Sequence, residues 1–372
     1  MSQRTHIGGI PLSYLSLATL AIQNAALILV MHYSRVMPIT GSHQYFTSTA
    51  VLLNEVLKLA IALAVALYDV KMESSEASYF NLRNWRTLYD QVFSGDSWKL
   101  AIPAALYTIQ NSLQYIAVSN LDAATFQVTY QSKILTTAIF SVTMLGRSLS
   151  LKKWLSLVIL MFGVGISQLP SNVSSSQKTA RAVAEHAEMN RFVGLMAVFI
   201  ACAISGLAGV YFEKVLKDGK KATVWVRNVQ LSFFSIIPAI LGVLLKDGGA
   251  IAEYGFFAGY NSVVWTAIVF QAVGGLLVAL VVNYADNIAK NFATSISIII
   301  SFFASVYLFD FPITITFLVG MAAVLYATFL YSSPDRKTPS KPVEPLLETH
   351  PDDEESTYYD NERITVTQEK LG

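Results

Sequence analysis

The chain has 372 residues, of which 53% are hydrophobic and only 14% are charged, and its mean hydropathy is +0.48. An average soluble domain has roughly 25% charged residues, so this composition excludes an ordinary soluble protein and indicates a membrane protein. A net charge of +1 gives no reason to expect nucleic acid or any strongly charged partner. The single cysteine, Cys202, excludes an internal disulfide and a cysteine-based metal cluster, and we expect neither a metal nor a cofactor.

Ten runs are apolar and long enough to cross a hydrocarbon core, which takes about 17 to 25 residues. They are 12–33, 46–69, 98–119, 122–145, 151–169, 191–216, 222–245, 262–284, 288–309 and 313–332. Each should be a helix, because backbone groups in lipid must form hydrogen bonds within their own segment. The five histidines all lie at or beyond the ends of the runs, so none is placed as a buried general base and enzyme chemistry is disfavoured.

The loops between these runs predict the orientation. If the N-terminal segment 1–11 is cytosolic, most loop lysines and arginines also fall on the cytosolic side, as the positive-inside rule requires. An even number of spans then places both termini in the cytosol. The linker 170–190 would face the lumen or exterior, where its sequon at Asn172 could be glycosylated. Residues 333–372 are rich in Pro, Ser, Thr and charge, which predicts a disordered cytosolic tail.

A faint internal repeat divides the spans into two sets. Residues 131–170 align without gaps on 295–334, and each copy holds most of one span, a tight turn and a second span. We therefore expect two five-helix repeats, 12–169 and 191–332, which are inverted because five is an odd number. Shared apolar composition is the competing explanation. An inverted repeat would place a substrate site near the midplane, between the halves.

Lys133 lies near the centre of the fourth run, about 11 residues or about 16 Å from either end, too far to reach an interface. In lipid it would cost at least ~3 kcal/mol, so we expect it to face the bundle interior or a water-filled cavity. Helical spacing places polar and aromatic residues around it: Phe126, Thr129, Tyr130, Thr136 and Thr137. We favour a ligand-binding lysine over one that only caps carbonyl groups of a neighbouring helix.

Two other runs have polar stripes. One is Tyr107, Asn111 and Gln114 in the third run; the other is Lys290, Thr294, Ser297 and Ser301 in the ninth. Such stripes are more often contacts between helices, but two lysines on separate helices are harder to explain that way. Lysines suit a diphosphate, and aromatic rings and amides suit a nucleobase, so a nucleotide carrying a sugar fits. Any organic dianion would also satisfy the lysines.

Glu55 is the deep carboxylate that could carry protons, but Lys58 follows at i+3, where it can neutralise the charge. We interpret the two as a structural ion pair, since charges in membranes tend to pair. Passive exchange of nucleotides is therefore favoured over proton-driven uptake.

Several blocks resemble the Golgi nucleotide-sugar transporters of the drug/metabolite transporter superfamily, most of all the UDP-galactose branch. They include TAVLLNEVLKL, FQVTYQSKILTTA, GVYFEK and VVNYADNIAKNFATSISII. The resemblance covers about residues 12 to 333. It implies an all-α fold of ten helices in two inverted halves, a Golgi location, and antiport of a cytosolic nucleotide sugar against a lumenal nucleoside monophosphate.

The resemblance also implies roles for single residues. Lys133 matches the central phosphate-binding lysine and Lys290 a second one nearer the cytosol, while Tyr107 and Asn111 match the nucleobase side. The remaining predicted site residues are Ser205, Asn228, Tyr130, Phe126, Gln127, Thr294 and Ser297. Phe126 and Ser232 replace tyrosines of the CMP-sialic acid branch, so a sialic acid carrier is doubtful and a uridine carrier fits.

We expect UDP-sugar, UMP and the lipid bilayer as partners, and leave Golgi glycosyltransferases and a second copy of the chain open. UDP-galactose is the favoured cargo, with UDP-N-acetylglucosamine as a second or alternative one. Two other hypotheses are a non-transporting scaffold for glycosyltransferases and a proton-coupled permease of the same fold. A scaffold has no need for lysines at the midplane.

Overall fold

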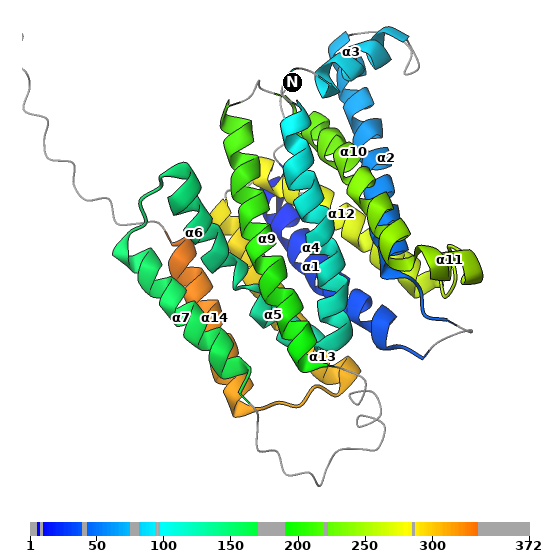
Figure 1. Ribbon diagram of the computed structural model, residues 1–372. Coiled ribbons are helices and arrows are strands. Elements are labelled where there is room, and N and C mark those ends of the chain that lie inside the picture. The colour runs from blue at the N-terminus through cyan, green and yellow to red at the C-terminus, as the bar shows by residue number, and fades with distance from the viewer. Residues whose placement is uncertain are drawn as a thin grey trace, which may run out of the picture. The chain divides into compact units, whose positions relative to one another are not determined.

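The computed structural model describes residues 6–7, 10–38, 43–74, 82–93, 95, 97–169, 190–218, 222–284 and 287–333, all of them in one structural unit, Met1–Ser333 (Figure 1). The sequon at Asn172, most of the predicted linker 170–190 and the predicted tail after Ser333 lie outside the described residues.

Helices form over the apolar runs of the first half, as predicted. They are α1 (Leu12–Val36), α2 (Thr47–Ser74), α4 (Ala101–Asn120), α5 (Ala123–Tyr130), α6 (Lys133–Leu145) and α7 (Leu151–Ser167). A 3-10 turn, η1 (Ser97–Leu100), leads into α4. Three short elements were not predicted: the helix α3 (Leu82–Val92), and the strands β1 (His6–Ile7) and β2 (Ile10–Pro11), which pair antiparallel ahead of α1.

The second half is also helical. Its elements are α9 (Arg191–Asp218), α10 (Val224–Gly242), the π-helical turn η3 (Val243–Asp247), α11 (Gly248–Tyr254), α12 (Ser262–Tyr284), α13 (Asn287–Phe309) and α14 (Ile315–Ser332). Threonine side chains cap the N-termini of two of these helices. Thr223 Oγ1, before α10, accepts a hydrogen bond from the Val226 N–H at 3.3 Å, and Thr314 Oγ1, before α14, accepts one from the Phe317 N–H at 3.2 Å.

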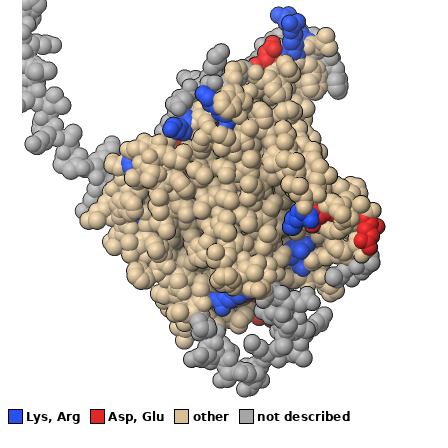
Figure 2. Space-filling view, viewed as in Figure 1, with Lys and Arg blue, Asp and Glu red and all other residues tan. Residues whose placement is uncertain are grey.

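Five helical segments among the described residues have the length and apolar character needed to cross a membrane. They are Leu17–Val36, Thr47–Met72, Arg191–Val215, Val224–Tyr254 and Ile315–Ser332, and shorter apolar stretches lie at Ser262–Leu277 and Ala293–Phe309. On the face shown in Figure 2, charged side chains gather toward the end that carries α3 and toward the end that carries α11, with an uncharged band between. This distribution suits a slab of lipid around the bundle.

The prediction of one unbroken span over 122–145 is wrong, because the helix is interrupted between α5 and α6. The Ile134 N–H bonds to the Gln131 carbonyl at 2.9 Å, where a continuous α-helix would use the carbonyl of Tyr130. That carbonyl instead accepts from the Cys202 thiol of α9 at 3.5 Å, and the same thiol also bonds to the backbone of Lys133. A tertiary contact thus supplies hydrogen bonds that the helix gives up.

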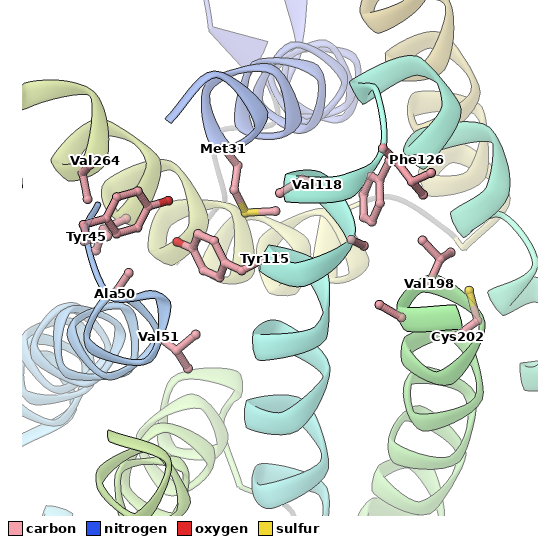
Figure 3. Packing of buried hydrophobic residues seen from close by; sticks show 14 residues of the cluster. Met31, Tyr45, Ala50, Val51, Tyr115, Val118, Phe126, Val198, Cys202 and Val264 are labelled. Carbon is pink, nitrogen blue, oxygen red and sulfur yellow. The ribbon is translucent and has the colours of Figure 1, made fainter. Parts of the chain in front are cut away.

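The helices pair across the two halves of the chain. α4 packs on α9, α2 on α10, α1 on α12 and α13, α6 on α9, and α7 on α14. Two glycines allow α7 and α14 to pack closely: a Cβ on Gly320 of α14 would lie 2.6 Å from the Gly163 carbonyl oxygen of α7. At the centre of the bundle, Met31, Tyr115, Phe126 and Cys202 belong to one buried cluster (Figure 3).

The same turn occurs twice. Gly146 (φ 62°) follows α6 and Asp310 (φ 50°) follows α13, both in the left-handed region. In each case the N–H of the following residue donates a hydrogen bond to a serine carbonyl six residues earlier. Arg147 donates to Ser141 at 3.3 Å, and Phe311 donates to Ser305 at 3.2 Å. These positions are matched by the alignment of 131–170 with 295–334, so the aligned segments share a local structure and not only composition.

Candidate functional site

The side chain of Tyr130 contacts both a cation and a second aromatic ring. Lys133 Nζ is 4.5 Å from the centroid of the Tyr130 ring. The Phe126 ring stacks on the same Tyr130 ring, with their centroids 5.3 Å apart and an angle of 16° between their planes. A cation over an aromatic face is stabilised by the ring quadrupole. The helix break therefore brings three predicted site residues together, with the ammonium held on a ring inside the bundle.

Helix α4 fixes the other end of Tyr130. The amides of Gln110 and Gln114 each donate to its hydroxyl at 2.8 Å, and Ser205 of α9 is a further hydrogen-bonding partner. Gln114 was part of the predicted stripe, but Gln110 was missed, although its i−4 spacing from Gln114 could have revealed it. Tyr107, one turn earlier on α4, is partly buried.

A second polar cluster surrounds Glu55, which is fully buried. Lys58 Nζ lies 2.9 Å from Oε2 and 3.1 Å from Oε1, and Asn54 Nδ2 donates to Oε1 at 3.0 Å. Asn111 Nδ2 donates to the same oxygen at 3.3 Å. The predicted ion pair and the predicted nucleobase-side amide are thus one hydrogen-bonded group, a connection that sequence spacing did not indicate.

Some buried polar atoms beside these clusters have no hydrogen-bond partner within the described part of the chain. They are Asn54 Oδ1 on α2, Gln110 Oε1 on α4 and Ser232 Oγ on α10. Buried polar groups are normally paired, because leaving one unpaired costs about 1–3 kcal/mol. Such atoms on three neighbouring helices are available to hydrogen-bond a ligand.

Other predicted site residues contact neighbouring protein groups. Gln127 Nε2 donates to Ser301 Oγ at 2.8 Å, joining α5 to α13, and Ser297 Oγ donates to the Thr294 carbonyl at 2.7 Å. Asn228 Nδ2 donates to the Val224 carbonyl at 3.0 Å, in the first turn of α10. The first of these bonds joins two helices, as polar stripes commonly do, and the other two stay within one helix.

Two residues of the predicted Lys133 stripe are used elsewhere. Thr129 Oγ1 accepts from the amide of Gln168, just after α7, at 2.8 Å, and Thr136 Oγ1 donates to the Cys202 carbonyl at 2.6 Å. Lys290 lies in α13, but its side chain is outside the described residues.

A separate polar network lies at the start of α2. The hydroxyl groups of Tyr45 and Ser34 are hydrogen-bonded at 2.7 Å, and Arg35 donates to the Tyr45 carbonyl at 3.0 Å. The hydroxyl groups of Thr49 and Tyr260 are hydrogen-bonded at 2.7 Å. Burial raises the pKa of Tyr260 to about 12, so its hydroxyl remains neutral near pH 7. This network ties α1, α2 and the loop before α12 together.

A small pocket adjoins this network, away from the predicted site. It is lined by Ser34, Met37, Pro38, His43, Gln44, Tyr45 and Gly259. None of these is a predicted site residue. Among the described residues, no group of three or more His, Cys, Asp or Glu side chains is placed to bind a metal ion.

Comparisons with known proteins give a consistent result. A family model described as nucleotide-sugar transporter matches residues 9–332. The chain is 55% identical over 334 residues to the UDP-galactose transporter of Schizosaccharomyces pombe, covering 90% of this chain and 91% of the relative. It is 49% identical over 323 residues to the UDP-N-acetylglucosamine transporter of Rattus norvegicus, covering 86% and 95%. The UDP-galactose translocator of Mus musculus is 46% identical over 323 residues, covering 87% and 79%.

Proposed function

Because this chain belongs to the nucleotide-sugar transporter family, we propose that it carries UDP-galactose from the cytosol into the Golgi lumen in exchange for UMP. Family membership confirms the prediction of a transporter in place of an enzyme. The observation that carries the choice of site is the lysine at the interrupted helix, Lys133, held over Tyr130 inside the bundle.

In this proposal Lys133 binds the diphosphate as a point charge. Its ammonium would leave the Tyr130 ring or share it with the ligand, at little cost because cation–π contacts are weak compared with a phosphate pair. Lys290 would supply a second positive charge from the cytosolic side. Asn111, with Tyr107 one turn away, would bind the uracil edge, since its Nδ2 is engaged by Glu55 and its oxygen can accept from the base N–H.

The proposed mechanism is alternating access between two inverted five-helix halves, 12–169 and 191–332, making ten spans in all. The helix pairs support it. If each span of one half is replaced by the span at the same place in the other half, the α4–α9 pair becomes α12–α1 and the α6–α9 pair becomes α13–α1. The α2–α10 and α7–α14 pairs remain the same. A pairing pattern that survives this exchange is expected of repeats related by a two-fold axis. Segment 1–11 and the tail 333–372 would then be cytosolic and the linker 170–190 lumenal.

Energy coupling by nucleotide exchange is supported by the contacts of Glu55. Its carboxylate is paired with Lys58 and accepts two amide hydrogen bonds. A role as a proton carrier would require Glu55 to separate from these partners. A proton-coupled permease is therefore the less favoured reading.

Uptake into proteoliposomes tests the proposal. Vesicles preloaded with UMP should accumulate UDP-galactose faster than empty ones, and a protonophore should not slow them. A panel of UDP-, GDP- and CMP-sugars would show whether UDP-N-acetylglucosamine is also carried or preferred. This sugar nucleotide is the second candidate because several relatives are UDP-N-acetylglucosamine transporters. Absence of uptake of every sugar, with ligand binding also absent, would favour a scaffold.

The proposed topology has its own test. Protease added to sealed Golgi vesicles should remove a C-terminal tag, because the tail would be cytosolic. Protection of that tag would overturn the orientation and the side assigned to Lys290.

A further inference from the structure

Helix α3 (Leu82–Val92) is too short to span a membrane, and it lies at one end of the bundle near the end of α2 (Figure 1). One side of it is buried by protein: Leu88 and Val92 pack in a cluster with Val70 of α2 and Val226 of α10. Gln230 of α10 donates to the Val92 carbonyl at 2.7 Å and so satisfies the C-terminal end of α3. The helix is therefore fixed to both α2 and α10.

A second side of α3 is exposed and apolar. Its residues, spaced three or four apart, are Leu82 (85% exposed), Trp85 (37%), Tyr89 (62%) and Phe93 just after the helix (41%). At about 100° per residue this row lies next to the buried row and does not coincide with it. The helix thus has two apolar sides, of which protein covers one.

The exposed row continues onto the outer surface of α10. The Phe93 ring meets Phe233 of α10 edge to face at 5.2 Å, and beyond it α10 exposes Ile237 (57%), Ile240 (43%) and Leu241 (50%). That surface belongs to a helix apolar and long enough to cross a membrane. The row on α3 is therefore continuous with a surface that faces lipid, and it ends in the aromatic residues typical of the membrane–water boundary.

The third side of α3 is polar, with exposed Arg83, Arg86, Thr87 and Asp90. Figure 2 shows Lys and Arg side chains with an acidic one at the end of the molecule that carries α3. Arginine beside a row of aromatic residues can reach lipid phosphate groups while its methylene groups remain near the acyl boundary.

We propose that α3 is an interfacial helix that seats its Leu82–Trp85–Tyr89–Phe93 row in the bilayer boundary and binds anionic lipid headgroups through Arg83 and Arg86. In the topology proposed above this is the cytosolic leaflet, but the seating depends only on α3 lying at an end of the spans. Because α3 rests on one helix of each half, lipid bound there stabilises one arrangement of α2 relative to α10. The occupant is the membrane, not a protein, since the row merges with the lipid-facing surface of α10.

Depth measurements test the seating. The native cysteine, Cys202, is buried, so single cysteines introduced by Tyr89→Cys and Thr87→Cys can be spin-labelled in the full chain, with the unsubstituted chain as the labelling control. In nanodiscs, the label at 89 should be exposed to oxygen and lie about 5–10 Å inside the boundary. The label at 87 should be exposed to a water-soluble nickel chelate. A label at 89 that is exposed to the chelate, or hidden from both reagents by protein, would overturn the proposal.

Lipid dependence tests the arginines. Adding phosphatidylserine to phosphatidylcholine nanodiscs should raise the thermal midpoint of the unsubstituted protein, and the dependence of this rise on phosphatidylserine content measures anionic-lipid binding. Each of Arg83→Gln and Arg86→Gln should weaken that binding about fivefold. Lys214→Gln, an exposed lysine of α9, is the matched control and should change it less. Equal effects of all three variants would mean nonspecific charge attraction and contradict the proposal. UDP-galactose affinity in neutral lipid should be unchanged, which separates this result from any failure of the proposed transport function.

Discussion

The segments 131–145 and 295–309 align with each other, yet only the second lies within an unbroken helix. Lys133 aligns with Ser297, whose hydroxyl bonds to a carbonyl one turn back within α13. At the first segment the helix is interrupted between the end of α5 at Tyr130 and the start of α6 at Lys133, and the Cys202 thiol donates a hydrogen bond to the Tyr130 carbonyl. Helix α13 continues through the second segment, and just ahead of that segment Ala293 packs with Leu20 and Ala21 of α1.

This difference separates the fold from the site. Both segments end in the same left-handed turn, at Gly146 and Asp310, so the turn belongs to the architecture of each half. Within the two aligned segments, the helix break and a lysine occur only in the first. Interrupted helices in transporters commonly mark substrate sites, which is the role proposed for the first segment.

Replacing Lys133 by methionine should have the largest effect. Methionine keeps a similar length and apolar packing, so the protein should fold, but a lost charge-assisted contact should lower UDP-galactose affinity at least about 30-fold. Ligand-induced thermal stabilisation of the purified protein measures this. Lys153→Met, at the start of α7, is the control and should bind normally. Normal binding with reduced thermal stability in the Lys133 variant would instead identify a structural lysine.

Helices α7 and α14, the last helices of the two proposed repeats, test the part that the repeats share. A Cβ on Gly320 would lie 2.5 Å from the Ser167 backbone nitrogen, so Gly320→Ala should lower the free energy of unfolding by about 1.5 kcal/mol. Gly165→Ala is the control, since a Cβ there meets nothing within 4 Å. Thermal midpoints in detergent compare the two. UDP-galactose affinity should be retained by both variants, and its loss in the Gly320 variant would mean that architecture and site are not separable.

Tyr130→Phe sharpens the comparison inside the broken segment. The ring remains for Phe126 and Lys133, but the amides of Gln110 and Gln114 lose their shared acceptor. We expect UDP-galactose affinity to fall about fivefold, since a net hydrogen bond is worth about 1 kcal/mol. Tyr326→Phe, at an exposed position on α14, should bind as the unsubstituted protein does. An unchanged affinity in the Tyr130 variant would show that the hydroxyl does not position the lysine.

The two turns should give the smallest effects, opposite in sign. A non-glycine residue is strained at positive φ, so Asp310→Gly should raise the free energy of unfolding by about 0.5 kcal/mol and Gly146→Asp should lower it by a similar amount. Thermal midpoints of the two single variants measure both changes. Shifts of the same sign would show that the turns are not structurally equivalent.

The sequence by itself determined where most helices form, because apolar length is a local property that each run carries. It also indicated that Lys133 faces away from lipid, since the cost of a charge in hydrocarbon does not depend on its neighbours. The family could be recognised from blocks such as FQVTYQSKILTTA, and the comparisons confirm it.

Only the tertiary structure decided which groups meet. At the helix break, the Tyr130 carbonyl accepts a hydrogen bond from a thiol about seventy residues away, and the bond from Asn111 to Glu55 depends on how α4 packs against α2. Helix α3 was missed because it is short and its charged residues mask the apolar ones; Leu88 and Val92 are buried only by contact with α2 and α10. Hydrogen-bond partners between helices follow from packing, which hydrophobic patterning alone does not specify.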